Sequence, residues 1–423
     1  MKRALVIGAN EEAVFSIRTA QRHGLWVDAM DGNEKAKGLP AADEAYHVDI
    51  NDLTRVFAIT DQLQPCVVVP APIGHCLTTI GAVNDRYHLA GVSQAAAEKC
   101  TDKYRFHQAM REAGLRNAEL VLLEEGQKVR EEELSGMTRF PVIVKPRFGS
   151  GSRGVEICGN RQELLCFLQY ELGKDTGLLE DYIAETCIPG PEYGVDGAYV
   201  DGAYVDGEFR MVLLRRKKNT PPPYRQCVGY YAQLPEEEPA FYEKCCRLMQ
   251  KTGAAMGFQN CVVHADLIRE RKEDGTLTDE PFVIETSARP SGHNLSNLFT
   301  PLSTGVTLVE DFLKLALPEL MDSRNENNEN TKGLFRPEKT RKLLIRYFDL
   351  AKGTVLSVPD PGELKERYPL LDYVCHIRPG DQLTEVRDGA SVMGRGYYIL
   401  EGENDAQLDA ADEKLRAEFR VQA

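Results

Sequence analysis

The sequence predicts several packed modules, with an α/β domain at the N-terminus followed by α+β domains. Three observations support this fold class. Short apolar runs alternate with helical patterns over residues 1–100, strand-like segments dominate residues 140–285, and a polar Asn- and Glu-rich stretch at 321–333 precedes a last group of strands. The chain of 423 residues also exceeds the usual size of one domain, so two to four modules are expected.

The first domain, residues 1–100, is predicted to contain a doubly wound parallel sheet, because strands alternate with helices along it. Its apolar runs are ALVIG, LWVDAMD and CVVVPAP, and its helical patterns span 15–22 and 53–63. The turn Gly8-Ala9-Asn10 follows the first strand, but the three spaced glycines of a dinucleotide fingerprint are absent. We therefore do not expect this domain to bind a dinucleotide.

The second region, residues 101–320, is predicted to be an α+β catalytic core. It begins with the amphipathic helix TDKYRFHQAMREAGL, and helices near 162–172 and 240–256 interrupt its strands. The pentapeptide DGAYV occurs twice in tandem between 196 and 205, which is typical of tight hairpins or a local duplication. After the exposed connection at 321–333, residues 334–423 are predicted to form a small α+β module that ends in the helix LDAADEKLRAEFR.

Composition excludes several classes of partner. The chain carries 51 Lys and Arg against 65 Asp and Glu, and its net charge of -14 repels a nucleic-acid backbone. No apolar run approaches the roughly 20 residues that span a bilayer, and MKRALVIGAN leads into a strand without a cleavable signal pattern. We expect a cytoplasmic protein without nucleic-acid or membrane partners. The eleven cysteines form no C-x-x-C pair, so reduced, structural thiols are expected.

A loop of small residues is the strongest local signal. In FPVIVKPRFGSGSRGVEIC, a strand carrying Lys145 leads into a loop from Gly149 to Gly154 and then into a second strand. Small residues let backbone N–H groups approach phosphate oxygens, and a lysine at the strand edge adds a positive charge. The loop is not a Walker A sequence, because the lysine precedes the glycines. A plain hairpin tip beside a solvated lysine remains the alternative.

Two further segments point to nucleotide and metal binding. QNCVVHADLI and PFVIETSARPSGHNL carry Asp266 and Glu285 near their strand ends, and such paired carboxylates beside phosphate are typical of Mg²⁺ sites. Glu285, Ser287 and Arg289 alternate along one side of the last strand, although a surface salt-bridge edge has the same pattern. LLEDYIAETCIPGPEYGVDG contains an apolar slot and carboxylates that suit an adenosine, or an ordinary strand and loop.

The order of these blocks resembles the ATP-grasp superfamily, which includes biotin carboxylase, D-alanine:D-alanine ligase and the L-amino-acid ligases. The resemblance covers roughly residues 1–420. It implies a Rossmann-like pre-ATP-grasp domain at 1–100, a two-lobed ATP-grasp catalytic domain at 101–320, a flexible linker at 321–333 and a C-terminal α+β module at 334–423.

The resemblance also implies roles for individual residues. Two lysines would contact phosphate, the small-residue loop would be a phosphate lid, and the segment at 180–192 would surround adenine and ribose. This cofactor-binding set is Lys103, Lys145, Gly149, Ser150, Gly151, Ser152, Gly154, Glu180, Ile183 and Glu192. Asp266, Glu285 and Ser287 would hold the metal, and Arg289 would be catalytic. Many family members carry Asn where Ser287 stands, so its ligand role is the departure from the pattern.

The implied function is an ATP- and magnesium-dependent carboxylate-amine ligase, with Mn²⁺ as an alternative metal. It would activate a carboxylate as an acyl phosphate, join it to an amine and release ADP and phosphate. Its partners would be small-molecule carboxylates and amines, and a homodimer is left open. A carboxylase that activates bicarbonate and a non-catalytic nucleotide-binding regulatory protein are the alternatives. The basic stretch 215–218 would face the substrate pocket, or would simply be solvated.

Overall fold

The N-terminal domain is a parallel sheet in the computed structural model, which describes residues 1–115, 118–149, 154–173, 177–201, 207–221, 226–321, 330–386 and 389–422. Its strand order is β3-β2-β1-β4. The strands are β1 (Arg3–Ile7), β2 (Trp26–Asp31), β3 (Glu44–His47) and β4 (Val67–Val68), accompanied by helices α1 (Ala13–Arg22), α2 (Leu53–Leu63) and α3 (Leu77–Tyr87). The predicted parallel sheet is confirmed, while β3 and α3 were not predicted because neither has a clear apolar period.

Two short helices lead from this domain into the core: α4 (Gln94–Thr101) and α5 (Lys103–Glu112). Asp102 separates them, since its side chain accepts hydrogen bonds from the backbone N–H groups of Tyr104 and Arg105 and so caps α5. The predicted amphipathic helix is therefore confirmed with its start at Lys103. Gly114 stops the helix in a left-handed conformation, with φ of 66°.

A small antiparallel sheet follows, in the order β5-β8-β6-β7. Its strands are β5 (Leu120–Leu123), β6 (Val142–Pro146), β7 (Glu156–Cys158) and β8 (Tyr182–Thr186), and α6 (Arg161–Cys166) continues as the π-helix η3 (Phe167–Gly173). One face of this sheet packs on these helices through Val142, Val144 and Ala184. The other face is free to carry polar side chains.

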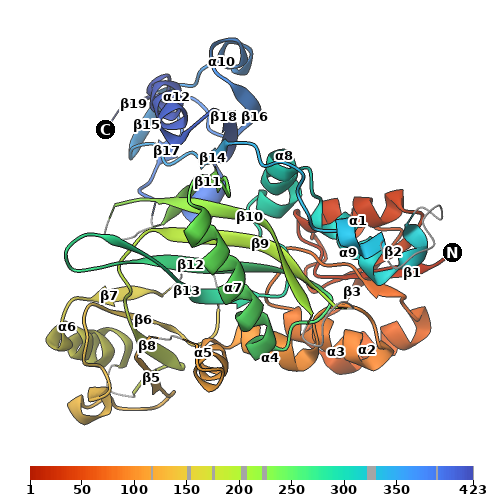
Figure 1. The fold of residues 1–423 in the computed structure, drawn as a ribbon, viewed down its shortest axis with the longest axis horizontal. Helices are drawn as coiled ribbons and strands as arrows, with labels where there is room; N and C mark the ends of the chain where they lie inside the picture. Colours follow the sequence, from red (N-terminus) through yellow and green to blue (C-terminus); the bar gives the residue numbers. More distant parts are fainter. Residues whose placement is uncertain are drawn as a thin grey trace.

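The large sheet is antiparallel and has eight strands, in the order β13-β12-β9-β10-β11-β14-β18-β16. Figure 1 shows it at the centre of the molecule, crossed by α7, with the N-terminal domain to its right and the small sheet to its lower left. The core strands of this sheet are β9 (Glu192–Val200), β10 (Glu208–Asn219), β11 (Cys227–Gln233), β12 (Cys261–Arg271) and β13 (Leu277–Ser287), and the helix is α7 (Pro239–Met256). The first DGAYV copy ends β9, while residues 202–205 of the second copy lie outside the described residues.

The C-terminal residues extend this sheet. Strand β14 (Leu343–Tyr347) pairs with β11, and β18 (Gly396–Glu401) and β16 (Leu370–Cys375) follow outward. The C-terminal elements beyond these strands are α10 (Pro361–Arg367), α11 (Gly389–Met393), α12 (Asp405–Ala417), β15 (Gly353–Ser357), β17 (Gln382–Leu383) and β19 (Arg420–Gln422). The predicted C-terminal α+β region is present, but its sheet is shared with the core. Within the predicted linker, residues 322–329 lie outside the described part of the chain.

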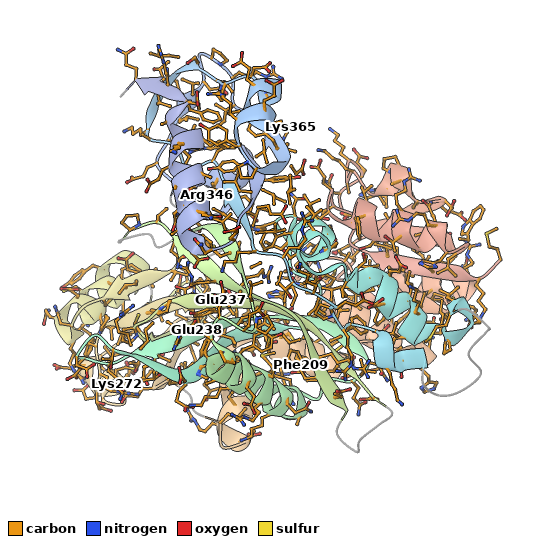
Figure 2. The ribbon with its side chains drawn as sticks, turned by 45° about the horizontal axis from the view of Figure 1, so that its top comes forward. Phe209, Glu237, Glu238, Lys272, Arg346 and Lys365 are labelled. Carbon is orange, nitrogen blue, oxygen red and sulfur yellow. The ribbon has the colours of Figure 1, made fainter. Side chains whose placement is uncertain are left out.

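Charged contacts hold the C-terminal elements against the core. Lys342 lies 2.7 Å from Glu237, and Lys218 on β10 lies 2.6 Å from Asp409 of α12. Figure 2 places Arg346 at the base of the C-terminal module and Glu237 on the core below it. After β13, helices α8 (Thr300–Thr304) and α9 (Leu308–Ala316) return to the N-terminal domain, and Phe312 joins one hydrophobic core with residues of both regions.

No helix among the described residues has both the length and the apolar character needed to cross a membrane. All eleven cysteines are free thiols, as the sequence predicted.

Candidate functional site

One face of the large sheet gathers the predicted acidic residues. Asp266 on β12 lies opposite Glu285 on β13, and His264 lies opposite Ser287. Opposed residues in an antiparallel pair share a face, as do alternate residues along a strand. These four side chains therefore point the same way, while the intervening Ala265 is fully buried on the other face. The predicted juxtaposition of Asp266 and Glu285 is thus present in the structure.

Lys217 occupies the middle of this acidic group. Its Nζ lies 2.5 Å from Oδ2 of Asp266 and 3.4 Å from Oε2 of Glu192, and Asn219 donates to the other oxygen of Glu192. Burial would lower the pKa of Lys217, but the two carboxylates outweigh it and raise that pKa, so the side chain is an ammonium ion. The structure therefore joins a predicted ribose ligand and a predicted metal ligand through one lysine.

Strand alternation divides the basic stretch between two faces. Arg215 and Lys217 point to the acidic side of the sheet, whereas Arg216 contacts Asp405 at 2.5 Å on the other side. Lys218 also points away and lies 2.6 Å from Asp409 of α12. Two of the four basic residues therefore share the face of the acidic group, and both are buried there in charged contacts.

The carboxylates of Asp266 and Glu285 fit a magnesium ion. Mg²⁺ in nucleotide sites is commonly held by one or two carboxylates together with substrate phosphates and water. Glu285 is exposed and no charged partner lies within ion-pair distance of it in the described ranges, while the Ser287 hydroxyl follows two residues later on the same face. No group of three or more His, Cys, Asp or Glu suited to a metal occurs among the described residues.

The free face of the small sheet carries Lys145. Its Nζ lies 2.6 Å from Oε1 of buried Glu185, and Nε2 of His107 lies 2.7 Å from the other carboxylate oxygen. Ile183 is opposite Lys145 in the strand register and shares this face. Burial would raise the pKa of Glu185, but Lys145 and His107 outweigh it and lower the pKa to about 2.

Sequence reasoning missed Glu185 as a site residue. The signal was present in YIAET, where Glu185 follows Ile183 at the two-residue period of a strand. The adenine contact of Glu180 stays a prediction. Its carboxylate accepts a hydrogen bond from the hydroxyl of Tyr182, and Tyr182 packs in the core on the opposite face from Lys145. The structure therefore separates Glu180 from Lys145 but keeps Ile183 beside it.

Lys103 lies at the base of the predicted phosphate lid. Its Nζ donates to the carbonyl oxygens of Pro146 at 2.9 Å and Gly149 at 3.0 Å. Burial lowers the pKa of Lys103, and nearby Lys145 lowers it further, so these two ammonium groups are close enough to repel.

The ends of the lid need glycine. Gly149 has φ of 104° and Gly154 has φ of 68°, a left-handed region that other residues rarely adopt. Between them, Ser150, Gly151 and Ser152 of the predicted lid lie outside the described residues.

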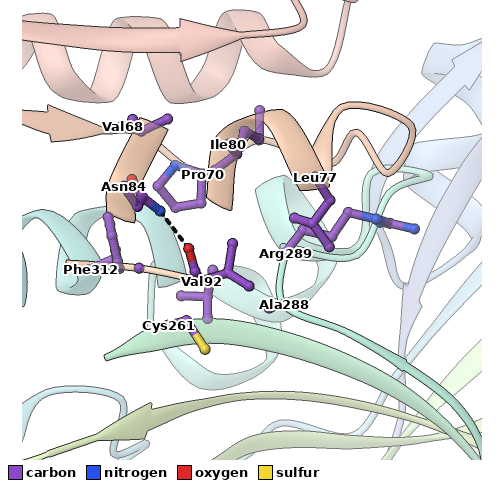
Figure 3. Close-up of a pocket in the computed structure, with 13 residues that line it drawn as sticks. Val68, Pro70, Leu77, Ile80, Asn84, Val92, Cys261, Ala288, Arg289 and Phe312 are labelled. Atoms are coloured by element: carbon purple, nitrogen blue, oxygen red, sulfur yellow. Dashed lines mark hydrogen bonds between the residues drawn. The ribbon is translucent and has the colours of Figure 1, made fainter. Parts of the chain in front are cut away.

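Arg289 lies beyond the end of β13, in a loop. The strand ends at Ser287, so the prediction that Arg289 continues the strand alternation is wrong, and loop geometry sets its direction. Its Nη1 donates to the carbonyl oxygen of Pro290. In Figure 3 its guanidinium extends away from the apolar residues that line the small pocket beside it. Burial lowers the pKa of Arg289, while Glu285 and Glu12 act in the opposite direction, which places both carboxylates near it.

Loops of the N-terminal domain complete this corner of the site. A Cβ atom added at Gly74 would lie 3.2 Å from Nε of Arg289, so glycine allows this close approach. Glu12, just before α1, accepts a hydrogen bond from the backbone N–H of Asn294 at 2.8 Å. No local pattern links residues 12 and 74 to a loop near 290, because contacts so distant along the chain follow from the domain packing.

Comparisons with known proteins agree with this architecture. A sequence model described as the ATP-grasp domain matches residues 138–294. An uncharacterised protein from Sinorhizobium fredii is 25% identical over 343 residues, which are 78% of this chain and 63% of that protein. The chain spans 47% and 62% of the lengths of two further curated relatives.

Two crystal structures match the whole fold. The L-amino acid ligase from Bacillus licheniformis has a TM-score of 0.75 at 20% identity, over 100% of this chain and 99% of that one. The phosphoribosylglycinamide synthetase from Anaerococcus prevotii has a TM-score of 0.69 at 18% identity, again over 100% and 99%. At these identities the likeness establishes a shared fold.

Proposed function

We propose that this chain, a member of the ATP-grasp superfamily, is an ATP- and magnesium-dependent ligase that activates a carboxylate and joins it to an amine. One observation carries the proposal: a lysine at the base of the predicted lid lies near the acidic strand ends of the large sheet. Lys103, the first residue of α5, donates to the carbonyl oxygen of Gly149 at 3.0 Å and is close enough to Glu285 of β13 to interact with it electrostatically. A triphosphate between them would meet positive charge on one side and metal-binding oxygens on the other.

The nucleotide would lie between the two sheets. Lys145 and Lys103 would neutralise its phosphates, and the backbone N–H groups of the loop from Gly149 to Gly154 would donate to phosphate oxygens. Ile183 would contact the adenine on the Lys145 face, and Glu192 would accept from ribose hydroxyls. Glu185 holds the Lys145 ammonium at 2.6 Å before nucleotide binds, so it would position that lysine.

Asp266 and Glu285, with Ser287, would hold magnesium. A metal there would draw charge from the terminal phosphate oxygens. Arg289 would donate its planar pair of N–H groups to the oxygens of the transferred group, because a guanidinium matches two oxygens in one plane.

The reaction would proceed in two balanced steps. A substrate carboxylate oxygen attacks the terminal phosphorus of ATP, the bond to the bridging oxygen breaks, and ADP leaves. A neutral amine then attacks the carbonyl carbon of the acyl phosphate, loses a proton, and displaces inorganic phosphate to leave an amide. Positioning and charge neutralisation would supply most of the catalysis. The fold shared with an L-amino acid ligase and a phosphoribosylglycinamide synthetase supports this reaction class.

Product analysis tests the proposal. The protein is incubated with Mg–ATP and pools of amino acids and small carboxylic acids, and separately with bicarbonate plus biotin. We expect ADP and phosphate in equal amounts, with release stimulated by the carboxylate and amine pools. AMP and pyrophosphate would exclude the acyl phosphate, stimulation by bicarbonate plus biotin would identify a carboxylase, and nucleotide binding without turnover would identify a regulatory protein.

A further inference from the structure

A second polar group lies on the same face of the large sheet, next to the acidic strand ends. Arg215 on β10 donates from Nη2 to Oδ1 of Asp196 at 2.9 Å and from Nη1 to the hydroxyl of Ser291 at 3.3 Å. The hydroxyl of Thr300 donates to Oδ2 of Asp196 at 2.5 Å. The side chains of Arg215 and Asp196 are 2% and 0% exposed, so this is a fully buried ion pair.

Three buried nitrogen atoms beside this pair lack a hydrogen-bond partner among the described residues. They are Nε of Arg215, Nε2 of His264 and Nε of Arg289. Buried polar atoms are nearly always hydrogen-bonded, so each such exception needs an explanation. Three unpartnered nitrogen atoms close together indicate that a bound ligand, and not the protein itself, completes their hydrogen bonds.

The sheet register places these atoms close together. His264 on β12 lies opposite Asp196 on β9, the carboxylate that pairs with Arg215, so the imidazole and the guanidinium share one face of the sheet. His264 also lies opposite Ser287, two residues before Arg289. Both oxygens of Asp196 are already occupied by Arg215 and Thr300, which leaves the Nε edge of Arg215 for another acceptor.

The sheet register sets the distance of this group from the proposed reaction centre. Asp266 pairs with Gly194, and Gly194 pairs with Arg215, so Arg215 lies two strands from Asp266, or about 10 Å between backbones. His264 lies two residues from Asp266 along β12, or about 7 Å. A small molecule with two polar ends could reach both groups at once.

We propose that Arg215 and His264 bind a second carboxylate of the substrates, one that the ligation does not consume. The inference rests on the proposed function, because it places the activated carboxylate beside Asp266 and Arg289. A guanidinium N–H and an imidazole N–H suit the two oxygens of a carboxylate. The Tyr230 ring lies 5.3 Å from Cζ of Arg215 and holds the guanidinium plane in place. The second carboxylate belongs either to a dicarboxylic acid substrate or to an amino acid that serves as the amine.

Matched ligand pairs test the proposal and separate its two sources. Succinate is compared with succinamate, and alanine with alaninamide, by calorimetric titration with and without Mg–ADP. In the wild type we expect one carboxylate ligand to bind at least tenfold more tightly than its amide. The succinate pair identifies a dicarboxylic acid, and the alanine pair identifies an amino acid nucleophile.

Variants then assign the preference to the proposed residues. Arg215→Lys keeps the charge that Asp196 needs but loses the Nε donor, and His264→Leu removes the imidazole. We expect each of these two variants to lose most of the tenfold preference for the carboxylate, while its affinity for Mg–ADP stays within twofold of the wild type. His264→Gln, which keeps an N–H donor, should retain part of the preference. Arg216→Lys, the same change on the opposite face, should leave the preference intact.

The proposal is overturned if neither pair shows a preference in the wild type, or if Arg215→Lys and His264→Leu both retain it. If instead the proposed function is wrong, Mg–ADP does not bind. The preference for the carboxylate ligand can still be measured without nucleotide, so the two failures are distinguishable. Thermal melts of each variant confirm that the protein is folded during the titrations.

Discussion

The Nζ atom of Lys217 lies 2.5 Å from Oδ2 of Asp266, so a buried lysine pairs with a carboxylate that we assign to the metal. The same lysine lies 3.4 Å from Glu192. A fixed positive charge at this position balances the carboxylates before any ligand arrives, and it also repels an incoming divalent cation.

The first prediction follows from this repulsion. Lys217→Met should bind Mn²⁺ about tenfold or more tightly in the absence of nucleotide, because a competing charge within a few ångströms of the carboxylates has been removed. Titration followed by the electron paramagnetic resonance of free Mn²⁺ measures the affinity. Lys218→Met, whose charge lies on the other face of the sheet, is the control. Weaker Mn²⁺ binding in Lys217→Met would contradict the assignment of Asp266 to the metal.

A second prediction concerns Lys145. Lys145→Ala should weaken binding of a non-hydrolysable ATP analogue severely, by about tenfold or more, since a charge-assisted contact to phosphate is lost. Lys218→Ala should weaken it little, because Lys218 contacts Asp409 instead of the nucleotide. Calorimetric titration compares the two, and equal losses would indicate a general electrostatic effect.

The buried partner of Lys145 should also make stability depend on pH. Glu185 has a folded pKa of about 2, below its ordinary value of 4.5, because Lys145 and His107 outweigh the effect of burial. Its pairing therefore stabilises the fold fully above pH 4.5 and loses that contribution as pH falls towards 2. The wild type should melt at a higher temperature than Glu185→Gln at neutral pH, and about half of the stabilisation from this pairing should be gone near pH 3. A pH-independent difference would count against the paired carboxylate.

Glu285→Gln should abolish turnover and leave the fold intact. Its side chain is exposed, so replacing it with a neutral amide leaves the packing of the core unchanged, but the substitution removes a metal ligand. Thermal melts with and without Mg–ATP test this, because ligands that bind only the folded state raise the melting temperature. The wild type should gain stability and the variant much less. An unchanged gain would exclude Glu285 as a ligand.

Arg289→Lys should lower kcat by on the order of 10²-fold, with a much smaller change in ATP affinity, as loss of a transition-state donor typically does. A lysine keeps the positive charge but cannot offer two parallel N–H donors. Steady-state kinetics at saturating ATP and carboxylate measures the effect. A near-normal kcat with a raised KM for ATP would instead make Arg289 a ground-state binding residue.

Local sequence was sufficient for most elements of the core and for the acidic pair. Hydrophobic alternation predicted the strands that carry Asp266 and Glu285, and the small-residue loop after Lys145 predicted a candidate phosphate site. The acidic pair follows from the two-residue period of a strand, which fixes the face of each side chain once the strand is recognised. The order of motifs along the chain then indicated the superfamily.

Contacts between distant segments were decided only by the tertiary structure. The strand pattern could not show that Lys217 bridges Asp266 and Glu192, that Glu185 pairs with Lys145, or that β14 pairs with β11. Strand order and register depend on how whole elements pack, and a period of two fixes neither of them. The partners of Arg289 followed from the end of β13 at Ser287 and from the approach of Gly74 and Glu12, which no local pattern contains.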